Sequence, residues 1–83
     1  MRIIAVDDEK IALESLSSAI KTIVKEDEVL SFRYPEDALE YARENICDIA
    51  FLDIEMAGMS GVELASELKK FNSEINIVFC TGF

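Results

Sequence analysis

The chain has 83 residues, enough for one small domain that buries only about 63% of its surface on folding. Seventeen acidic and eight basic residues give a formal net charge of −9, which repels nucleic-acid phosphates and anionic lipid, so we expect no direct binding to nucleic acid or membrane. The absence of histidine excludes Ser-His and Cys-His catalysis and leaves only oxygen ligands for any metal.

The period of the apolar residues changes along the chain and predicts strands that alternate with helices. Residues 3–6 form a continuous apolar run, which is typical of a strand covered on both faces. From Ile11 to Val24 the apolar residues recur at steps of three and four, which predicts an amphipathic helix. Residues 29–34 alternate between apolar and polar side chains and predict a strand at the edge of a sheet.

The second half of the chain repeats this alternation. Pro35 predicts the start of a second helix, because proline suits the first helical position, and residues 49–52 predict a third, buried strand. Ser60 and Glu63 have the spacing of a capping box and predict the start of a third helix. The inner face of this helix is expected to contain Val62, Ala65, Leu68 and Phe71. Residues 75–80 predict a fourth strand.

Strands that alternate with helices form βαβ units, which predict an α/β fold with a parallel sheet. The fourth strand is as apolar as the first and third, and such a strand at a sheet edge would be a template for aggregation. We therefore expect the native protein to contain at least one more strand and helix than these 83 residues. We also expect these residues to self-associate through the open edge of the sheet.

The cysteines and the start of the chain predict the cellular compartment. Cys47 and Cys80 form no Cys-x-x-Cys pair and lie among apolar residues, so each is interpreted as a small buried hydrophobic residue. Only four apolar residues separate Arg2 from Asp7, too few for a secretory signal, and no apolar run is long enough to span a membrane. We therefore expect a cytoplasmic protein with reduced thiols.

Three acidic residues follow predicted strands: Asp7 and Asp8 after the first strand and Asp53 after the third. Because functional residues of parallel sheets gather beyond the carboxyl ends of the strands, we expect these carboxylates in one crevice. Two unit charges 4 Å apart repel by about 4 kcal/mol at an effective dielectric of 20, so the cluster requires protonation or a cation. Oxygen ligands of this kind suit Mg²⁺. Any one of these acids alone is better interpreted as a turn or capping residue, but the set of three predicts a site.

Three segments resemble the receiver domain of two-component response regulators: residues 6–9 (VDDE), 52–61 (LDIEMAGMSG) and 78–81 (VFCT). The middle segment is the most specific, and residues 11–14 (IALE) further resemble receivers of the LytR/AlgR-like transcription regulators. The resemblance spans residues 1–83, as the N-terminal part of a receiver domain. It implies a flavodoxin-like, doubly wound parallel sheet with strand order 2-1-3-4, without the family's fifth strand and last two helices.

The resemblance implies a role for each site residue. Asp53 is expected to be the phosphoacceptor, taking a phosphoryl group from a phosphohistidine on a sensor histidine kinase. Asp8 is expected to bind Mg²⁺ directly with Asp53, Asp7 partly through water, and Glu55 through its backbone carbonyl. Thr81 is expected to donate its hydroxyl to the phosphoryl group, shifting the loop after the fourth strand and switching an output, namely transcription regulation through another domain.

The chain departs from the family pattern in two places. Ala57 stands where the family usually has proline, which is expected to loosen the loop after Asp53 without removing a ligand. The family also continues through another helix, a fifth strand with a lysine that pairs with the phosphoryl group, and a last helix; the lysine is not among these residues.

Two other functions remain open. The chain could be a pseudo-receiver, an interaction scaffold that is never phosphorylated. It could also be a phosphatase or phosphotransferase with an aspartyl nucleophile, as in haloacid-dehalogenase-like folds. That fold would place Asp-x-Asp after the first strand, where this chain has Asp7 and Asp8 adjacent. The receiver interpretation is therefore favoured. It implies that the chain is a phosphoacceptor and not an enzyme, and that it catalyses at most its own phosphorylation and dephosphorylation.

Overall fold

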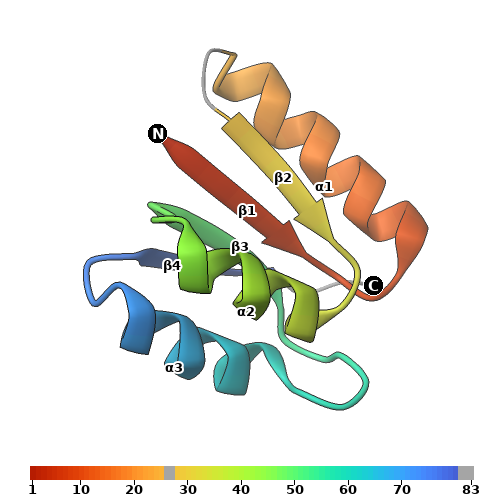
Figure 1. Ribbon diagram of the computed structural model, residues 1–83. Coiled ribbons are helices and arrows are strands. Elements are labelled where there is room, and N and C mark those ends of the chain that lie inside the picture. Colours follow the sequence, from red (N-terminus) through yellow and green to blue (C-terminus); the bar gives the residue numbers. More distant parts are fainter. Residues whose placement is uncertain (26–27, 81–83) are drawn as a thin grey trace.

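The computed structural model describes residues 1–25 and 28–80. In chain order the elements are β1 (Arg2–Val6), α1 (Lys10–Ile23), β2 (Glu28–Phe32), α2 (Pro35–Glu44), β3 (Ile49–Asp53), α3 (Gly61–Phe71) and β4 (Asn76–Cys80). The strands are parallel and lie in the order β2-β1-β3-β4, with α1 on one face of the sheet and α2 and α3 on the other (Figure 1). This confirms the predicted flavodoxin-like α/β fold and its strand order.

The central strand β1 places the carboxyl ends of its neighbours at one edge of the sheet. Its last residue, Val6, is in register with Phe32 of β2 and with Leu52 of β3. Successive side chains of β1 enter opposite cores: Ile4 packs with α2 and α3, and Ile3 packs with α1. Full burial of such a side chain contributes about 1.5–3 kcal/mol, so a slip of one residue in this register would be strongly disfavoured.

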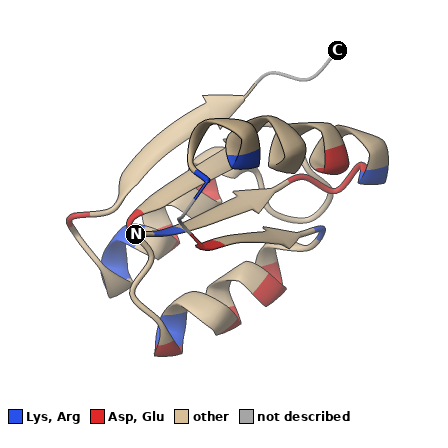
Figure 2. Cartoon of the chain, turned by 90° about the horizontal axis from the view of Figure 1, so that it is seen from above, with Lys and Arg blue, Asp and Glu red and all other residues tan. Residues whose placement is uncertain are grey.

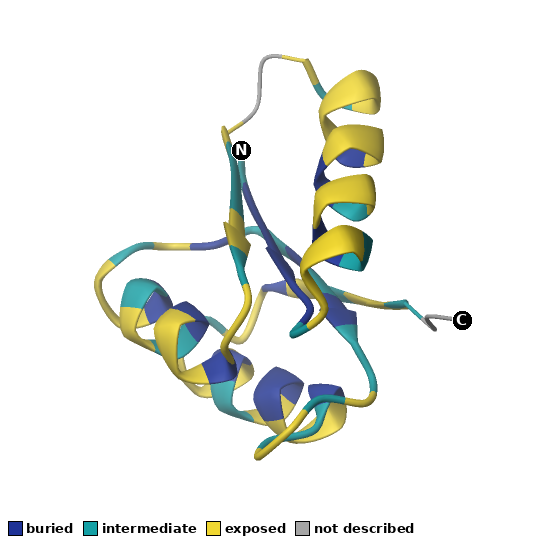
Figure 3. Cartoon of the chain, turned by 90° about the vertical axis from the view of Figure 1, so that its right-hand side faces the viewer, coloured by how far each residue is buried: buried dark blue, intermediate teal, exposed yellow. Residues whose placement is uncertain are grey.

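The helices bury only the side that faces the sheet (Figure 3). Helix α1 is anchored by Leu13 and Ile20, and α2 approaches the sheet closely through the small residues Ala38 and Ala42. As predicted, α2 begins at Pro35, and β2 therefore ends at residue 32, two residues before the predicted end of that strand. In the described ranges, no helix has both the length and the apolar character needed to cross a lipid bilayer.

The capping box predicted for α3 is present, and the predicted inner face of the helix is correct at Ala65 and Leu68 but wrong at Val62 and Phe71. The Ser60 side chain accepts a hydrogen bond from the Glu63 backbone N–H (3.1 Å), and the Glu63 carboxylate accepts one from the Ser60 N–H (3.0 Å). Val62 and Phe71 are 58% and 44% exposed. The buried residues of α3 are Gly61, Leu64, Ala65 and Leu68. These recur at steps of three and four, whereas the predicted set advanced by threes and drifted around the helix.

The residues of β4 are partly exposed, which agrees with the open sheet edge expected from the sequence. Val78 is 40% exposed and Phe79 is 44% exposed. Strand β4 lies at the end of the sheet and pairs only with β3, while α1 packs over β1 and β2. An apolar hollow next to α1 is lined by Ile3, Leu16, Ala19, Ile20, Ile23, Val24, Ile49 and Phe51.

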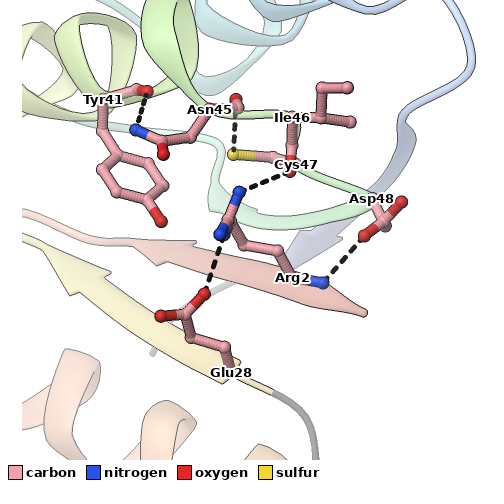
Figure 4. Close-up of polar contacts among 7 residues, drawn as sticks. All are labelled: Arg2, Glu28, Tyr41, Asn45, Ile46, Cys47 and Asp48. Atoms are coloured by element: carbon pink, nitrogen blue, oxygen red, sulfur yellow. Dashed lines mark hydrogen bonds and ion pairs between the residues drawn. The ribbon is translucent and has the colours of Figure 1, made fainter.

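A polar network closes the opposite, amino end of the sheet (Figure 4). The Arg2 guanidinium bonds the Glu28 carboxylate at 2.7 Å, which joins β1 to β2. It also donates to the Ile46 carbonyl at 3.4 Å, and the Arg2 backbone N–H donates to the Asp48 carboxylate at 2.7 Å. These contacts fix the connection between α2 and β3, so both ends of the β1–β3 pair are held in place.

The junction between β3 and α3 generates a prediction. The Gly61 N–H donates to the Ile54 carbonyl at 2.8 Å, and a Cβ at position 61 would overlap the backbone oxygen of Asp53. We expect Gly61→Ala to lower the free energy of unfolding by about 2–3 kcal/mol, the scale of overpacking, as measured by urea denaturation. Gly58→Ala is the control, because Gly58 has a φ of +86° but open space around it, so only the backbone strain of about 1 kcal/mol should be lost. Equal losses in the two variants would contradict this account.

Candidate functional site

Three carboxylates meet at the carboxyl edge of the sheet. Asp7 and Asp8 follow β1, and Asp53 is the last residue of β3. One oxygen from each lies within 4.8 Å of the others. Asp7 is buried, with 7% of its surface exposed, whereas Asp8 and Asp53 are half-buried. The cluster is therefore accessible to solvent through Asp8 and Asp53. The sheet register therefore brings together the three acids that the sequence predicts as a site.

Backbone N–H groups hold the first two carboxylates. Asp7 Oδ1 accepts from the Glu9 N–H at 2.9 Å, and Asp8 Oδ2 accepts from the Ala57 N–H at 2.9 Å. The second bond was not foreseen, because Ala57 was expected to loosen its loop. Proline has no N–H, so only a residue other than proline can make this bond, and Ala57 ties the loop to Asp8. The alanine at position 57, where the family usually has proline, was the sequence feature that could have indicated this hydrogen bond.

The surroundings of Asp53 disfavour its charged form. Burial is the main cause that raises the pKa of Asp53 above its ordinary value, and the neighbouring charges of Asp7 and Asp8 raise it further. Hydrogen bonds from the backbone of Glu55 and Ile54 act in the opposite direction. A cation would relieve this repulsion, and three carboxylate oxygens with no nitrogen or sulfur donor among them suit Mg²⁺. The residues present therefore fit the metal that the sequence predicts.

Of the two remaining predicted site residues, the structure describes Glu55 but not Thr81. The Glu55 side chain is exposed, and the Glu55 backbone N–H donates a hydrogen bond to the Asp53 carboxylate. The use of the Glu55 carbonyl as a metal ligand stays a prediction. Thr81 lies outside the described residues. Met56 and Met59, on the same loop as Glu55, pack against the core and seat the loop on the protein.

Neither cysteine is a candidate nucleophile. Both are free; Cys47 is buried as predicted, whereas Cys80 is only half-buried at the end of β4, in register with Asp53. Burial, followed by the charges of Asp53 and Asp7, raises the pKa of the Cys80 thiol. The thiol is therefore protonated at neutral pH and is a poor nucleophile.

The parallel sheet with strand order β2-β1-β3-β4 and an acidic cluster at its carboxyl edge is a flavodoxin-like arrangement, and comparison with known proteins identifies the family. A model of the response regulator receiver domain family matches residues 3–83. The chain therefore belongs to the response regulator receiver domain family of two-component systems.

Curated relatives include transcription regulators. The chain is 31% identical over 83 residues to the sensory transduction protein LytT of Bacillus subtilis (strain 168), a match that covers 100% of this chain and 34% of LytT. It is 35% identical over 83 residues to the transcriptional regulatory protein YpdB of Escherichia coli (strain K12), with the same coverage of 100% and 34%. The chain thus spans about a third of the length of these relatives.

Solved structures show the same fold. The response regulator protein TrrA of Thermotoga maritima, in complex with Mg²⁺ and BeF, matches with a TM-score of 0.85 and 33% identity, over 99% of this chain and 70% of TrrA. TrrA in complex with the histidine kinase ThkA matches with a TM-score of 0.83 and 33% identity, over 99% of this chain and 69% of that chain.

The repulsion among the carboxylates generates a prediction for the metal-free protein. Because the pKa of Asp53 is raised in the fold, its ionisation opposes folding, and stability is lost as the pH rises from the ordinary aspartate value of 3.8 through the raised value. We expect Asp53→Asn to be more stable than the native chain by roughly 0.5 kcal/mol at pH 7 in EDTA, and equally stable below pH 3.8. Urea denaturation at both pH values measures this.

The matched control is Asp37→Asn, which removes an exposed charge from the first turn of α2. This variant should lose a few tenths of a kcal/mol, because a negative charge there is favourable to the helix dipole. A gain of stability in both variants would attribute the effect to net charge and contradict the local explanation.

Proposed function

We propose that residues 1–83 are the N-terminal part of a receiver domain in a cytoplasmic response regulator that controls transcription. In this proposal Asp53 accepts a phosphoryl group from a sensor histidine kinase. The convergence of Asp7, Asp8 and Asp53 within 4.8 Å is the observation that carries the proposal. The complex of TrrA with ThkA supports a kinase partner, and the names of LytT and YpdB support a role in signalling and transcription.

The chemistry follows from the positions of the carboxylates. Asp8 and Asp53, with Asp7 and the Glu55 carbonyl, would hold Mg²⁺, which supplies charge neutralisation and orientation of the phosphoryl group. A carboxylate oxygen of Asp53, held by backbone N–H groups, attacks the phosphorus. The new O–P bond forms as the N–P bond of the phosphohistidine breaks, and the released imidazole nitrogen takes a proton from solvent. Asp53 is modified in this reaction, so the chain is an acceptor and not an enzyme in the usual sense.

Phosphorylation would then change the edge of the sheet next to β4. The phosphoryl group adds about −1.5 to −2 charges and three acceptor oxygens. Cys80 of β4 is in register with Asp53, and Thr81 follows Cys80 in the sequence. We propose Thr81 as the hydroxyl donor to the phosphoryl group. A shift of the chain at this point would alter the surface that partners recognise.

The proposed transfer can be tested by intact mass after incubation with Mg²⁺ and acetyl phosphate. We expect one phosphoryl adduct in the native protein and none in Asp53→Asn. Asp37→Asn, which changes an exposed aspartate on α2, should keep the adduct. Turnover of the donor without a stable adduct would instead support the phosphatase, and a folded protein without an adduct would support the scaffold.

We further propose that the chain self-associates through β4. The residues of β4, Asn76–Cys80, include no charge and no proline, the features that protect natural sheet edges. The other edge strand, β2, begins with Glu28 in an ion pair with Arg2. An unprotected edge with exposed Val78 and Phe79 can pair with the same strand of a second copy.

Sedimentation velocity at several concentrations tests this association. We expect the native chain to form dimers as concentration rises, and Val78→Lys to shift the dissociation constant upward by at least about tenfold, because a charge would be buried in the paired edge. Val62→Lys is the control, because Val62 is also an exposed valine but lies on α3, away from the sheet edge. A native chain that remains monomeric throughout would refute the proposal.

A further inference from the structure

Arg33 lies next to Asp8 at the carboxyl edge of the sheet. It directly follows β2, whose last residue, Phe32, accepts a hydrogen bond at its carbonyl from the Asp7 N–H at 3.2 Å. Arg33 Nη2 donates to the backbone carbonyl of Asp8 at 3.3 Å, and the guanidinium carbon lies 5.7 Å from the centre of the Tyr34 ring. The register of β1 and β2 therefore sets this cation at the same edge as the three carboxylates.

Positive charge is scarce at this edge. All eight basic residues of the chain lie in the described ranges. Six of them lie at the amino edge of the sheet, at the start of β1, at or just after the end of α1, or in the last turns of α2 and α3: Arg2, Lys21, Lys25, Arg43, Lys69 and Lys70. Only Lys10 and Arg33 lie at the carboxyl edge, where a blue segment follows β2 and a red segment follows β1 (Figure 2). Of these two, Arg33 alone contacts the acidic segment.

The charge of Arg33 has no anionic partner among the described residues. Its hydrogen bond goes to a carbonyl, and among residues 1–25 and 28–80 no carboxylate lies within ion-pair distance of its guanidinium. A guanidinium carries five N–H donors in a planar fork that matches two oxygens of a phosphate. The contact with Asp8 uses one of these donors and leaves the others for an incoming anion.

We propose that Arg33 is a specificity-determining residue of this site, which binds the phosphate oxygens of the incoming phosphodonor and directs it to Asp53. The inference rests on the proposed function. A phosphorylated donor must approach three carboxylates that repel it, and a cation at the rim offsets part of this repulsion. The guanidinium comes from the end of β2 and bonds the backbone carbonyl of Asp8, so it leaves the carboxylate oxygens of the cluster free for the metal.

The first test measures binding without transfer. Acetylphosphonate, which cannot transfer its phosphorus, is titrated into the protein with saturating Mg²⁺ and followed by ³¹P NMR. We expect Arg33→Gln to raise the dissociation constant about fivefold, the scale of an exposed ion pair, and Arg33→Lys to raise it less. Arg43→Gln is the matched control, because Arg43 also stacks on a ring, at 6.0 Å from the centre of Phe71, but at the amino edge.

The second test separates donor binding from support of Asp8. With acetyl phosphate as donor, Arg33→Gln should raise the donor concentration for half-maximal phosphorylation about fivefold and keep the maximal rate. The affinity for Mg²⁺ alone, measured by calorimetry, should stay within about twofold of the native value, whereas a residue that only positions Asp8 would lower it further.

The outcomes are distinguishable. An unchanged acetylphosphonate constant in Arg33→Gln, or an equal change in Arg43→Gln, overturns the role of Arg33 even if the Asp53 adduct forms. A loss of Mg²⁺ affinity that matches the loss of anion binding overturns it as well. If the anion constant changes as expected but no adduct forms on Asp53, the recognition role of Arg33 stands and the proposed function fails.

Discussion

The mutual repulsion of Asp7, Asp8 and Asp53 is the constraint on which the site depends. The fold holds their oxygens within 4.8 Å and raises the pKa of Asp53, so that negative charge is concentrated before any partner arrives. This cost is tolerated because the buried strand β1 and the backbone N–H groups at Glu9 and Ala57 fix the carboxylates. A site of this kind binds a hard cation and an anion together more readily than either alone, because each offsets the other's charge.

The rest of the fold serves this arrangement by fixing registers. Val6 is aligned with both Phe32 and Leu52, so the three strands end at one level and their following residues share one edge. The Arg2 network fixes the opposite end of the same strands, and Gly61 lets the start of α3 rest directly on the backbone of Asp53. The acidic edge is thus held in place by contacts at the amino ends of the strands and by the start of α3.

The sequence was sufficient to predict the α/β class and the three acids, because these depend on apolar periodicity and on the ends of strands, whereas the strand order followed from the resemblance to receiver domains. The predicted face of α3 was wrong at Val62 and Phe71, because three-residue steps mimic a helical stripe over a short segment. The exposure of Val78 agrees with the open sheet edge expected from the apolar fourth strand. The contacts of Asp8 with Ala57 and Arg33 join residues far apart in the chain, and no local pattern encodes them.

The hydrogen bond between Asp8 and Ala57 joins two segments that are 49 residues apart. Ala57 belongs to the loop that leads into α3, so this bond directly joins the acidic edge to the segment before that helix. By thermodynamic reciprocity, if a protein bound to α3 shifted this loop and changed the affinity of the edge for a ligand, the ligand would change the affinity for that protein by the same factor. A proline at position 57 has no N–H, so it would remove this bond between the two segments.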